Sequence, residues 1–144
     1  MPFVLDPRLA RDGPSLGDLP LCRAILRDVA PVPWVVLVPR RGGPGQSFDL
    51  EPAWRHALGE EVRACALALR GLFAPARINV ADIGNVCPQL HVHVVARFRD
   101  DPCWPGVVWG VDLPRCTPQA LARRVADLRG ALSERLPLDT RASG

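Results

Sequence analysis

Apolar and polar positions alternate most clearly in residues 89–98, QLHVHVVARF. One set of alternate positions is apolar: Leu90, Val92, Val94, Ala96 and Phe98. The other set is mostly polar: Gln89, His91, His93, Val95 and Arg97. Because successive side chains of a strand point to opposite faces, with about 6.6 Å between residues i and i+2, this pattern predicts a strand. We expect its apolar face to pack on a core and its polar face to present both imidazoles toward a cleft.

Two other stretches repeat apolar residues at helical spacing. The first follows Pro52, which suits the first turn of a helix, and its stripe comprises Trp54, Leu58, Val62, Cys65, Leu69 and Leu72. The second, over about 118–136, begins with Thr117-Pro118 as N-cap and first helical residue and ends before Pro137. The first helix is expected to cover the apolar face of the 89–98 strand.

Shorter apolar runs predict the remaining strands. Residues 34–39, WVVLVP, are mostly β-branched, and with the ambiguous run 21–28 they indicate an antiparallel hairpin. Residues 77–83, RINVADI, alternate and lead through the turn GNVCP into the 89–98 strand. These elements predict an α+β fold, an antiparallel sheet with helices packed on one face.

Segments rich in Pro, Gly and Asp separate these elements. We expect residues 1–20 to run extended over the surface, and residues 40–47 and 99–110 to form irregular loops. The chain has 144 residues, which suits a single domain over 1–144, with its core at about 20–110.

Composition narrows the chemistry. All 18 basic residues are arginine, and without lysine neither a Schiff base nor a phosphate-loop lysine is available. The net charge of +3 slightly favours small anionic ligands, and we expect no nucleic-acid partner. Five cysteines without a C-x-x-C pair indicate reduced thiols in a cytoplasmic protein. No signal peptide is apparent, and no stretch approaches the roughly 18 apolar residues that a membrane helix needs.

Two histidines on one strand face support three interpretations. Neutral imidazoles near pH 7 offer a nucleophile beside a hydrogen-bonding partner, and Arg97 adds a fixed positive charge to their row. Solvated histidines without a function are the second interpretation. A zinc site is the third, but His56, expected on a helix surface, is the only other histidine. A pair of Cys87 with His91 is disfavoured, because the adjacent Pro88 suggests a structural turn.

The segment QLHVHVV at 89–95 resembles the signature of the histidine-triad (HIT) family, His-φ-His-φ-His-φ-φ with φ apolar, except that Gln89 replaces the first histidine. WVVLVPRR, RINVADIGN and the run 85–110 extend the likeness over about residues 20–110, to small bacterial HIT proteins with glutamine at that place. The resemblance implies a HIT-like five-stranded antiparallel sheet with helices, no cofactor and no metal. It also implies a homodimer joined through strands and the long helix.

The activity implied by the resemblance is hydrolysis or transfer of a nucleotide at its α-phosphate. His91 corresponds to the nucleophile, which forms a covalent nucleotidyl-histidine, and His93 to the residue that hydrogen-bonds a phosphate oxygen. Gln89 would orient the substrate or His91. The residues expected to contact a purine nucleotide or nucleotide conjugate are Asn79, Gly84, Asn85 and Arg97.

Two departures from the family pattern limit this expectation. Gln89 cannot shuttle a proton, and Val86 stands where many members have a hydroxyl residue. Turnover is therefore expected to be slow or limited to good leaving groups, as in phosphoramidates and acyl-adenylates. A nucleotide-binding regulatory protein with little or no catalysis is the alternative.

The sequence allows more than one role for each of four further residues. Arg40 and Arg41 either attract a polyphosphate or belong to a solvated loop. Trp104 and Trp109 either stack on a base, cover a dimer seam or pack within their own loop.

Overall fold

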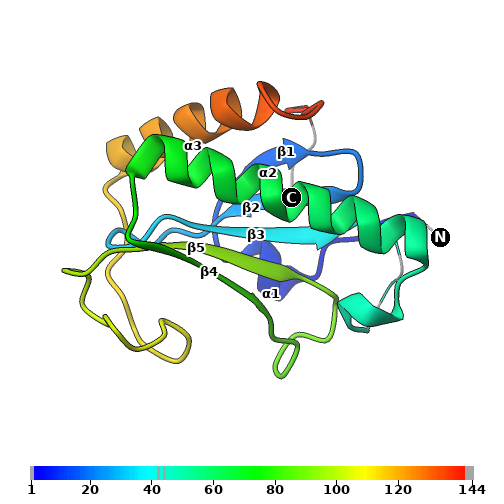
Figure 1. Cartoon of the computed structure of the whole chain (residues 1–144), viewed down its shortest axis with the longest axis horizontal. Coiled ribbons are helices and arrows are strands. Elements are labelled where there is room, and N and C mark those ends of the chain that lie inside the picture. The colour runs from blue at the N-terminus through cyan, green and yellow to red at the C-terminus, as the bar shows by residue number, and fades with distance from the viewer. Residues whose placement is uncertain (1, 42, 44, 142–144) are drawn as a thin grey trace.

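The computed structural model describes residues 2–41, 43 and 45–141, and an antiparallel sheet of five strands is the frame of that part of the chain (Figure 1). Its spatial order is β1-β2-β3-β5-β4. The strands are β1 (Ser15–Asp18), β2 (Cys22–Leu26), β3 (Trp34–Pro39), β4 (Arg77–Asp82) and β5 (Val92–Arg97). The expected α+β fold is confirmed, as is the hairpin of β2 and β3, whose register pairs Ala24 with Leu37.

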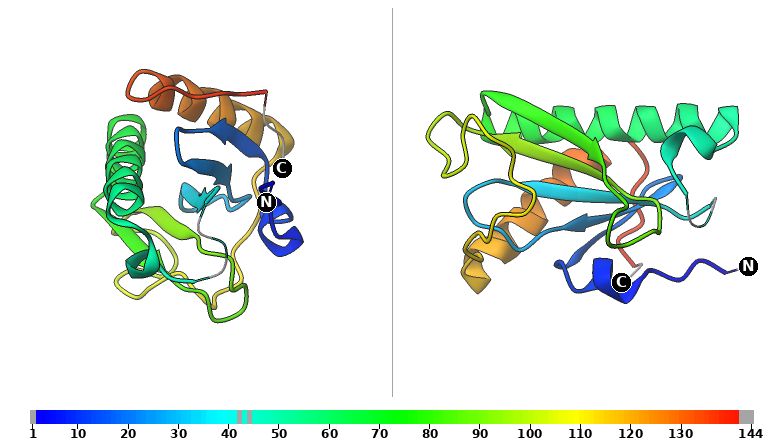
Figure 2. Two further views of the ribbon diagram at one scale, coloured as in Figure 1. Left: turned by 90° about the vertical axis from the view of Figure 1, so that its right-hand side faces the viewer. Right: turned by 90° about the horizontal axis from the view of Figure 1, so that it is seen from below.

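Both long helices, α2 (Pro52–Phe73) and α3 (Pro118–Ser133), lie on the same face of this sheet (Figure 2). Pro52 stands at the first turn of α2, and the Thr117 hydroxyl caps α3 by accepting a hydrogen bond from the Ala120 N–H. α2 ends where Ala74 adopts the left-handed conformation, with φ 47°. Both predicted helices are therefore confirmed.

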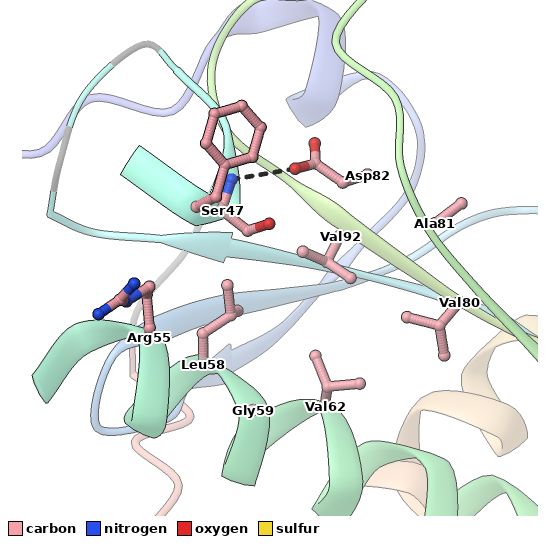
Figure 3. A pocket seen from close by; sticks show the side chains of 10 residues that line it. Ser47, Arg55, Leu58, Gly59, Val62, Val80, Ala81, Asp82 and Val92 are labelled. Carbon is pink, nitrogen blue, oxygen red and sulfur yellow. Dashed lines mark hydrogen bonds between the residues drawn. The ribbon is translucent and has the colours of Figure 1, made fainter. Parts of the chain in front are cut away.

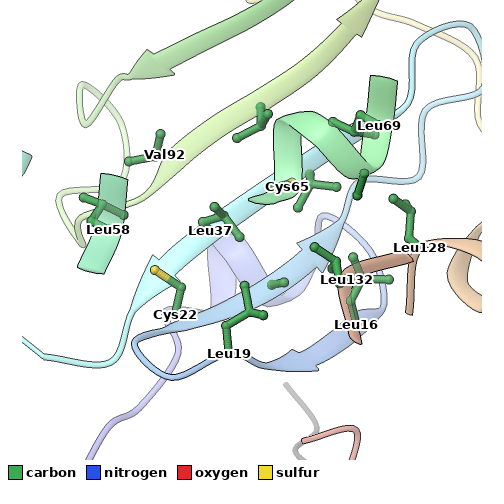
Figure 4. Packing of buried hydrophobic residues seen from close by; sticks show 14 of the residues in the cluster. Leu16, Leu19, Cys22, Leu37, Leu58, Cys65, Leu69, Val92, Leu128 and Leu132 are labelled. Atoms are coloured by element: carbon green, nitrogen blue, oxygen red, sulfur yellow. The ribbon is translucent and has the colours of Figure 1, made fainter. Parts of the chain in front are cut away.

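The main core fills the space between the helices and the sheet (Figure 4). Leu58, Cys65 and Leu69 of α2 lie in one buried cluster with the apolar row of β5, namely Val92, Val94 and Ala96. The apolar face of the histidine strand thus packs under α2, as its alternation predicts. Leu128 and Leu132 bring α3 into the same cluster.

A buried carboxylate fixes α2 to the start of β2. Glu61 is 2% exposed, and its two oxygens accept hydrogen bonds from the backbone N–H groups of Leu21 and Cys22 at 2.7 and 2.8 Å. Burial raises the pKa of the Glu61 carboxyl, whereas these hydrogen bonds act in the opposite direction.

The N-terminal segment differs from the expected extended surface run. It contains the short helix α1 (Pro7–Ala10) and the edge strand β1, and Leu16 and Leu19 are fully buried. Gly17 in β1 has φ +130°, and a Cβ there would come within 2.7 Å of the Asp139 carbonyl oxygen. A β-bridge between Asp18 and Asp139 joins β1 to the end of the chain.

The sheet face away from α2 and α3 is covered as well. Here α1 and the loop after β5 lie across the sheet from the two long helices (Figures 1 and 2). A second buried cluster joins Leu5 and Leu9 of the N-terminal segment, Val36 and Val95 of the sheet, and Val108 of the loop.

The connecting segments complete the described part. A 3-10 helix, η1 (Ser47–Asp49), precedes α2, and residues 99–110 contain no helix or strand, as expected. Within the predicted loop 40–47, Gly42 and Pro44 lie outside the described residues, as do Met1 and residues 142–144 of the predicted domain. None of the described helices has the length and apolar character required to cross a bilayer.

Candidate active site

β5 and the residue just before it hold the two histidines on the sheet face opposite α2. His93 is paired with Val36 of β3 and with Ala81 of β4, and directly paired residues share one face. His91 precedes β5, and its ring centre lies 5.0 Å from that of His93, with the ring planes at 75°. The prediction that both imidazoles project to the same side is confirmed.

The histidines are less accessible than the predicted cleft implies. His91 is 5% exposed and His93 is 6% exposed. Trp109 packs edge-on against His93, with ring centres 5.5 Å apart, so this tryptophan serves packing within the face. The site is therefore a covered row of imidazoles and not an open cleft, because the N-terminal segment and the 99–110 loop add a second apolar layer.

A backbone carbonyl fixes the proton of His91. The Nδ1 atom of His91 lies 2.7 Å from the Gln89 carbonyl oxygen. Because a carbonyl oxygen only accepts hydrogen bonds, Nδ1 must carry the proton and donate it. The Nε2 atom of neutral His91 consequently keeps its lone pair, which is the state that a nitrogen nucleophile requires.

His93 is held in the opposite tautomer. The indole Nε1–H of Trp34 donates a hydrogen bond of 2.9 Å to Nδ1 of His93. An indole nitrogen is only a donor, so Nδ1 of His93 accepts and its Nε2 carries the proton. Burial, followed by the positive charges of His91 and Arg27, lowers the pKa of His93 to about 3. At neutral pH His93 is thus an uncharged ring with an N–H to donate.

The side chain of Gln89 is engaged away from the imidazoles. Its Oε1 accepts a hydrogen bond of 2.8 Å from the Asp6 N–H, and its Nε2 donates one of 3.0 Å to the Val4 carbonyl. The amide thus accepts one hydrogen bond from the N-terminal backbone and donates another to it, which ties this segment to residue 89. The sequence suggested that the Gln89 side chain orients His91. In the structure it is instead the backbone carbonyl of Gln89 that does so.

Arg97 does not provide the free positive charge that the alternation suggested. It is 1% exposed, and its Nε and Nη2 atoms donate to the two carboxylate oxygens of Asp101 at 2.9 and 3.0 Å. Its Nη1 donates to Oδ1 of Asn79 at 2.9 Å. Arg97 also lies four residues beyond His93, about 13 Å along the strand. Its charge is neutralised by Asp101, and it serves to hold the loop after β5.

Asp101 is the carboxylate that balances the charge of Arg97. Burial alone would raise the pKa of its carboxyl, but hydrogen bonds from Arg97 and from the backbone of Phe98 and Cys103 lower it to about 2. Asp101 thus ties Arg97 to the backbone at the start of the loop after β5.

The turn before the histidines is exposed. Gly84, Asn85 and Val86 all lie at the surface, and Val86 is 81% exposed. The Val86 carbonyl accepts a hydrogen bond of 2.8 Å from Nη1 of Arg8. Cys87, in contrast, is buried in the second cluster, and burial raises the pKa of its thiol. A protonated thiol is a poor nucleophile, which argues against a Cys87–His91 pair.

Other candidates lie outside the histidine row. His56 is exposed on α2, as expected, across the sheet from His91 and His93. Within the described part of the chain, no three His, Cys, Asp or Glu side chains cluster in a way that could hold a metal ion. Arg40 donates to the Leu19 and Pro20 carbonyls, and Arg41 stacks at 5.0 Å on the Trp54 ring.

A hollow of about 390 Å³ opens at the β4 edge of the sheet, on the side of α2 (Figure 3). Leu58, Val62, Val80 and Val92 line it, and the Ser47 N–H donates to Asp82 at its rim. Val92 faces α2, whereas His91 and His93 face away from it. This hollow is therefore separate from the histidine row.

Three residues near the histidines were not predicted as part of the site. Arg27 lies with its guanidinium carbon 4.2 Å from the centre of the Trp34 ring, and an oxygen of Asp12 lies 3.8 Å from Nε of Arg27. Alternation along 34–39 could have placed Trp34 on the histidine face, since Trp34 and Val36 share it. Nothing in the sequence places Arg27 or Asp12 there, because their approach depends on how distant segments pack.

Comparison with known proteins agrees with this architecture. Residues 11–100 match the model of the HIT domain, and the chain belongs to the HIT family. Members of this family generally bind nucleotides, and many are nucleotide hydrolases or transferases. None of the curated proteins is similar enough to count as a match.

Several solved bacterial structures are similar over nearly their whole length. A histidine triad protein from Bradyrhizobium japonicum is 32% identical with a TM-score of 0.88, covering 92% of this chain and 99% of its own. One from Marinobacter aquaeolei is 36% identical with a TM-score of 0.89, covering 94% and 99%. A third, from Sinorhizobium meliloti, is 36% identical with a TM-score of 0.86, covering 90% and 96%.

Proposed function

We propose that this protein is a nucleotide hydrolase or nucleotidyltransferase that works through a covalent nucleotidyl-histidine at His91. The observation that carries the proposal is the pair of opposite tautomers. His91 offers an Nε2 lone pair, and His93, 5.0 Å away between ring centres, offers an Nε2–H. One ring is thus suited to attack phosphorus and the other to stabilise charge on a phosphate oxygen.

In the first step, Nε2 of His91 forms a bond to the α-phosphorus, and the leaving group departs with the electrons of its bond to phosphorus. The His91 ring gains positive charge, which its Nδ1–H shares with the Gln89 carbonyl. His93 donates its Nε2–H to a non-bridging oxygen of the phosphate. In the second step, water attacks phosphorus, His91 leaves as the neutral ring, and a nucleoside monophosphate is released with a proton to solvent.

Leaving-group chemistry narrows the substrates of this proposal. The Gln89 amide carries no acidic proton and is held by Val4 and Asp6, so it does not protonate a leaving group. Nucleotide conjugates whose leaving group departs as a stable anion, such as acyl-adenylates, are therefore the best candidates, and the departing amine of a phosphoramidate must take its proton from water. General acid–base help is typically worth about 10²–10⁴ in rate, and poorer leaving groups lose that factor here.

The nucleotide contacts are also proposed. Asn79 lies on the histidine face of β4, opposite Val95, and its oxygen is used by Arg97, so its amide N–H₂ is the group it offers. Gly84 and Asn85 offer backbone and amide groups from the exposed turn. A purine nucleotide is the ligand we expect, in a cytoplasmic protein.

Intact-protein mass spectrometry with an adenosine phosphoramidate tests the reaction. Wild type is expected to gain the mass of an adenylyl group, and His91→Ala to gain none, because the nucleophile is gone. The matched control is His56→Ala, which removes an exposed histidine on α2 and should leave the adduct unchanged. Undiminished turnover in His91→Ala would remove His91 from the mechanism.

A second candidate is a nucleotide-binding regulatory protein with little catalysis. The engaged Gln89 amide favours it, since the site then lacks a proton donor for many leaving groups. Calorimetry distinguishes the two functions. Binding of adenine nucleotides by wild type, with neither adduct nor turnover on any conjugate, would support the regulatory function.

A homodimer is the proposed assembly. β4 is an edge strand, and exposed apolar side chains lie beside it: Val80 is 52% exposed and Phe48 is 67% exposed. Both line the hollow between β4 and α2 (Figure 3). A second copy that packs on this surface would bury these side chains and protect the strand edge.

A further inference from the structure

Arg27 is fixed beside the histidine row by two contacts with Trp34. It follows β2, and its backbone N–H donates to the Trp34 carbonyl at 2.8 Å. Its guanidinium carbon lies 4.2 Å from the centre of the Trp34 ring, which is close for a cation–π contact. The same indole donates to His93. One tryptophan therefore holds the cation on its face and the imidazole at its Nε1–H.

The charge of Arg27 is only loosely paired. Its carboxylate partner is Asp12, with 3.8 Å between Nε and Oδ2, which exceeds hydrogen-bond length. The Nε atom of Arg27 is buried and has no hydrogen-bond partner within the described residues. Two other arginines on this side differ, since Arg8 and Arg97 both donate two hydrogen bonds to a carboxylate at 3.0 Å or less.

The charges of Arg27, Asp12 and the two histidines influence one another's pKa values. Arg27 contributes to the lowered pKa of His93, after burial and His91. Burial raises the pKa of the Asp12 carboxyl, and the charges of Arg27 and His91 act against that rise. Arg27 and His93 also contact the same indole, that of Trp34, so the guanidinium adds positive charge beside His93, and Asp12 is the carboxylate with which an anion there would compete.

We propose that Arg27 binds a second anionic group of the substrate, a phosphate beyond the α-phosphate, and that Asp12 is the internal counterion that this phosphate displaces. The proposal rests on the proposed function and adds to its substrates the derivatives of nucleoside diphosphates and longer polyphosphates, whose phosphate leaving group also departs as a stable anion. A guanidinium suits this role because its planar fork donates two parallel hydrogen bonds to a phosphate.

The binding test compares ADP with AMP by isothermal titration calorimetry. Wild type is expected to bind ADP about 10- to 100-fold more tightly than AMP, the range for hydrogen bonds to charged groups. Arg27→Gln should abolish most of this preference while AMP affinity stays within about 3-fold. Asp12→Asn should strengthen ADP binding, because the competing carboxylate is gone.

Arg23→Gln is the matched control. Arg23 lies four residues before Arg27, on the same sheet face, but it hydrogen-bonds Asp18 at 2.9 Å. Its substitution removes the same charge and should keep the ADP preference. Circular dichroism melting of each variant shows whether it is folded before its affinity is interpreted.

Three results would overturn the role of Arg27: equal affinity of wild type for ADP and AMP, equal loss of both ligands in Arg27→Gln, or weaker ADP binding in Asp12→Asn. None of them requires turnover. The role of His91 is tested separately by the adenylyl adduct. An ADP preference lost in Arg27→Gln, without any adduct on His91, would support the phosphate site and reject the covalent mechanism.

Discussion

The ring protons of His91 and His93 are set by one hydrogen bond each. The Gln89 carbonyl requires a proton on Nδ1 of His91, and the Trp34 indole requires a lone pair on Nδ1 of His93. Two identical side chains, two residues apart in the chain, thereby become an acceptor and a donor at Nε2. The difference arises from the local surroundings and not from the side chains themselves.

The folded protein is expected to lose stability in acid because of His93. The pKa of His93 is about 3 in the folded protein and ordinarily about 6.5, so the unfolded chain binds more protons between these values. Stability from neutral His93 is complete above about pH 6.5 and is lost as the pH falls toward 3. The slope is at most about 1.4 kcal/mol per pH unit for one proton.

Urea unfolding at pH 7, 6, 5 and 4 measures this slope. His93→Gln keeps a polar side chain but does not titrate, so its stability should change less with pH than that of wild type. Carboxylates such as Asp101 contribute equally to both proteins, and the difference between the two curves isolates His93. Parallel curves would mean that His93 titrates near its ordinary pKa.

At the scale of residues, the sequence predicted some side-chain positions correctly and missed others. Alternation placed His91 and His93 on one face, because side-chain direction is a local property of a strand. It failed for Arg97, whose charge is satisfied by Asp101, four residues along the chain. It also missed Arg27 and Asp12, since an ion pair between a strand end and an N-terminal turn is a property of tertiary packing.

At the scale of elements, the helices were the most predictable and the N-terminal segment the least. The stripes of α2 and α3 contain many apolar residues at regular spacing, so their period is evident. β1 contains a single large apolar residue, Leu16, within Ser-Leu-Gly-Asp. Its strand conformation depends on pairing with β2 and on the distant Asp139, and neither partner is visible from four residues.

The N-terminal segment is expected to depend on Gln89. Substitution by alanine removes both amide hydrogen bonds, leaving the Asp6 N–H and the Val4 carbonyl without those partners. We expect Gln89→Ala to lower the free energy of unfolding by about 1–3 kcal/mol and to speed amide hydrogen exchange in residues 4–6. Hydrogen-exchange mass spectrometry measures the second effect.

Gln119→Ala is the control for this experiment, because Gln119 is an exposed glutamine on α3. It should leave exchange in residues 4–6 unchanged. If Gln89→Ala also left that exchange unchanged, the amide would not be what holds the segment in place.

At the scale of the whole molecule, the two sheet faces have different roles. α2 and α3 cover one face, while the N-terminal segment and the loop after β5 cover the face with the histidines. The exposed apolar surface beside β4 lies on the α2 side (Figure 3). Assembly through that surface would therefore add no further cover to the histidine face.

Assembly is tested by one charge at the strand edge. Val80→Glu places a carboxylate on the apolar surface of β4, and we expect it to shift a dimer toward monomer in sedimentation velocity. Val107→Glu is the control, because Val107 is similarly exposed, at 61%, but belongs to the loop after β5. Dimers that persist in Val80→Glu would place the contact elsewhere.

Trp34 also gives the protein an internal optical reporter. Its indole contacts the Arg27 guanidinium, the His93 imidazole and the Trp109 ring, with ring centres 5.6 and 5.7 Å away for the last two. Indole fluorescence responds to nearby charge and to a hydrogen bond at its nitrogen. An anion arriving at Arg27 alters the first, and a proton arriving on His93 alters the second. Emission from this residue therefore follows occupancy and ionisation of the histidine row without an added dye.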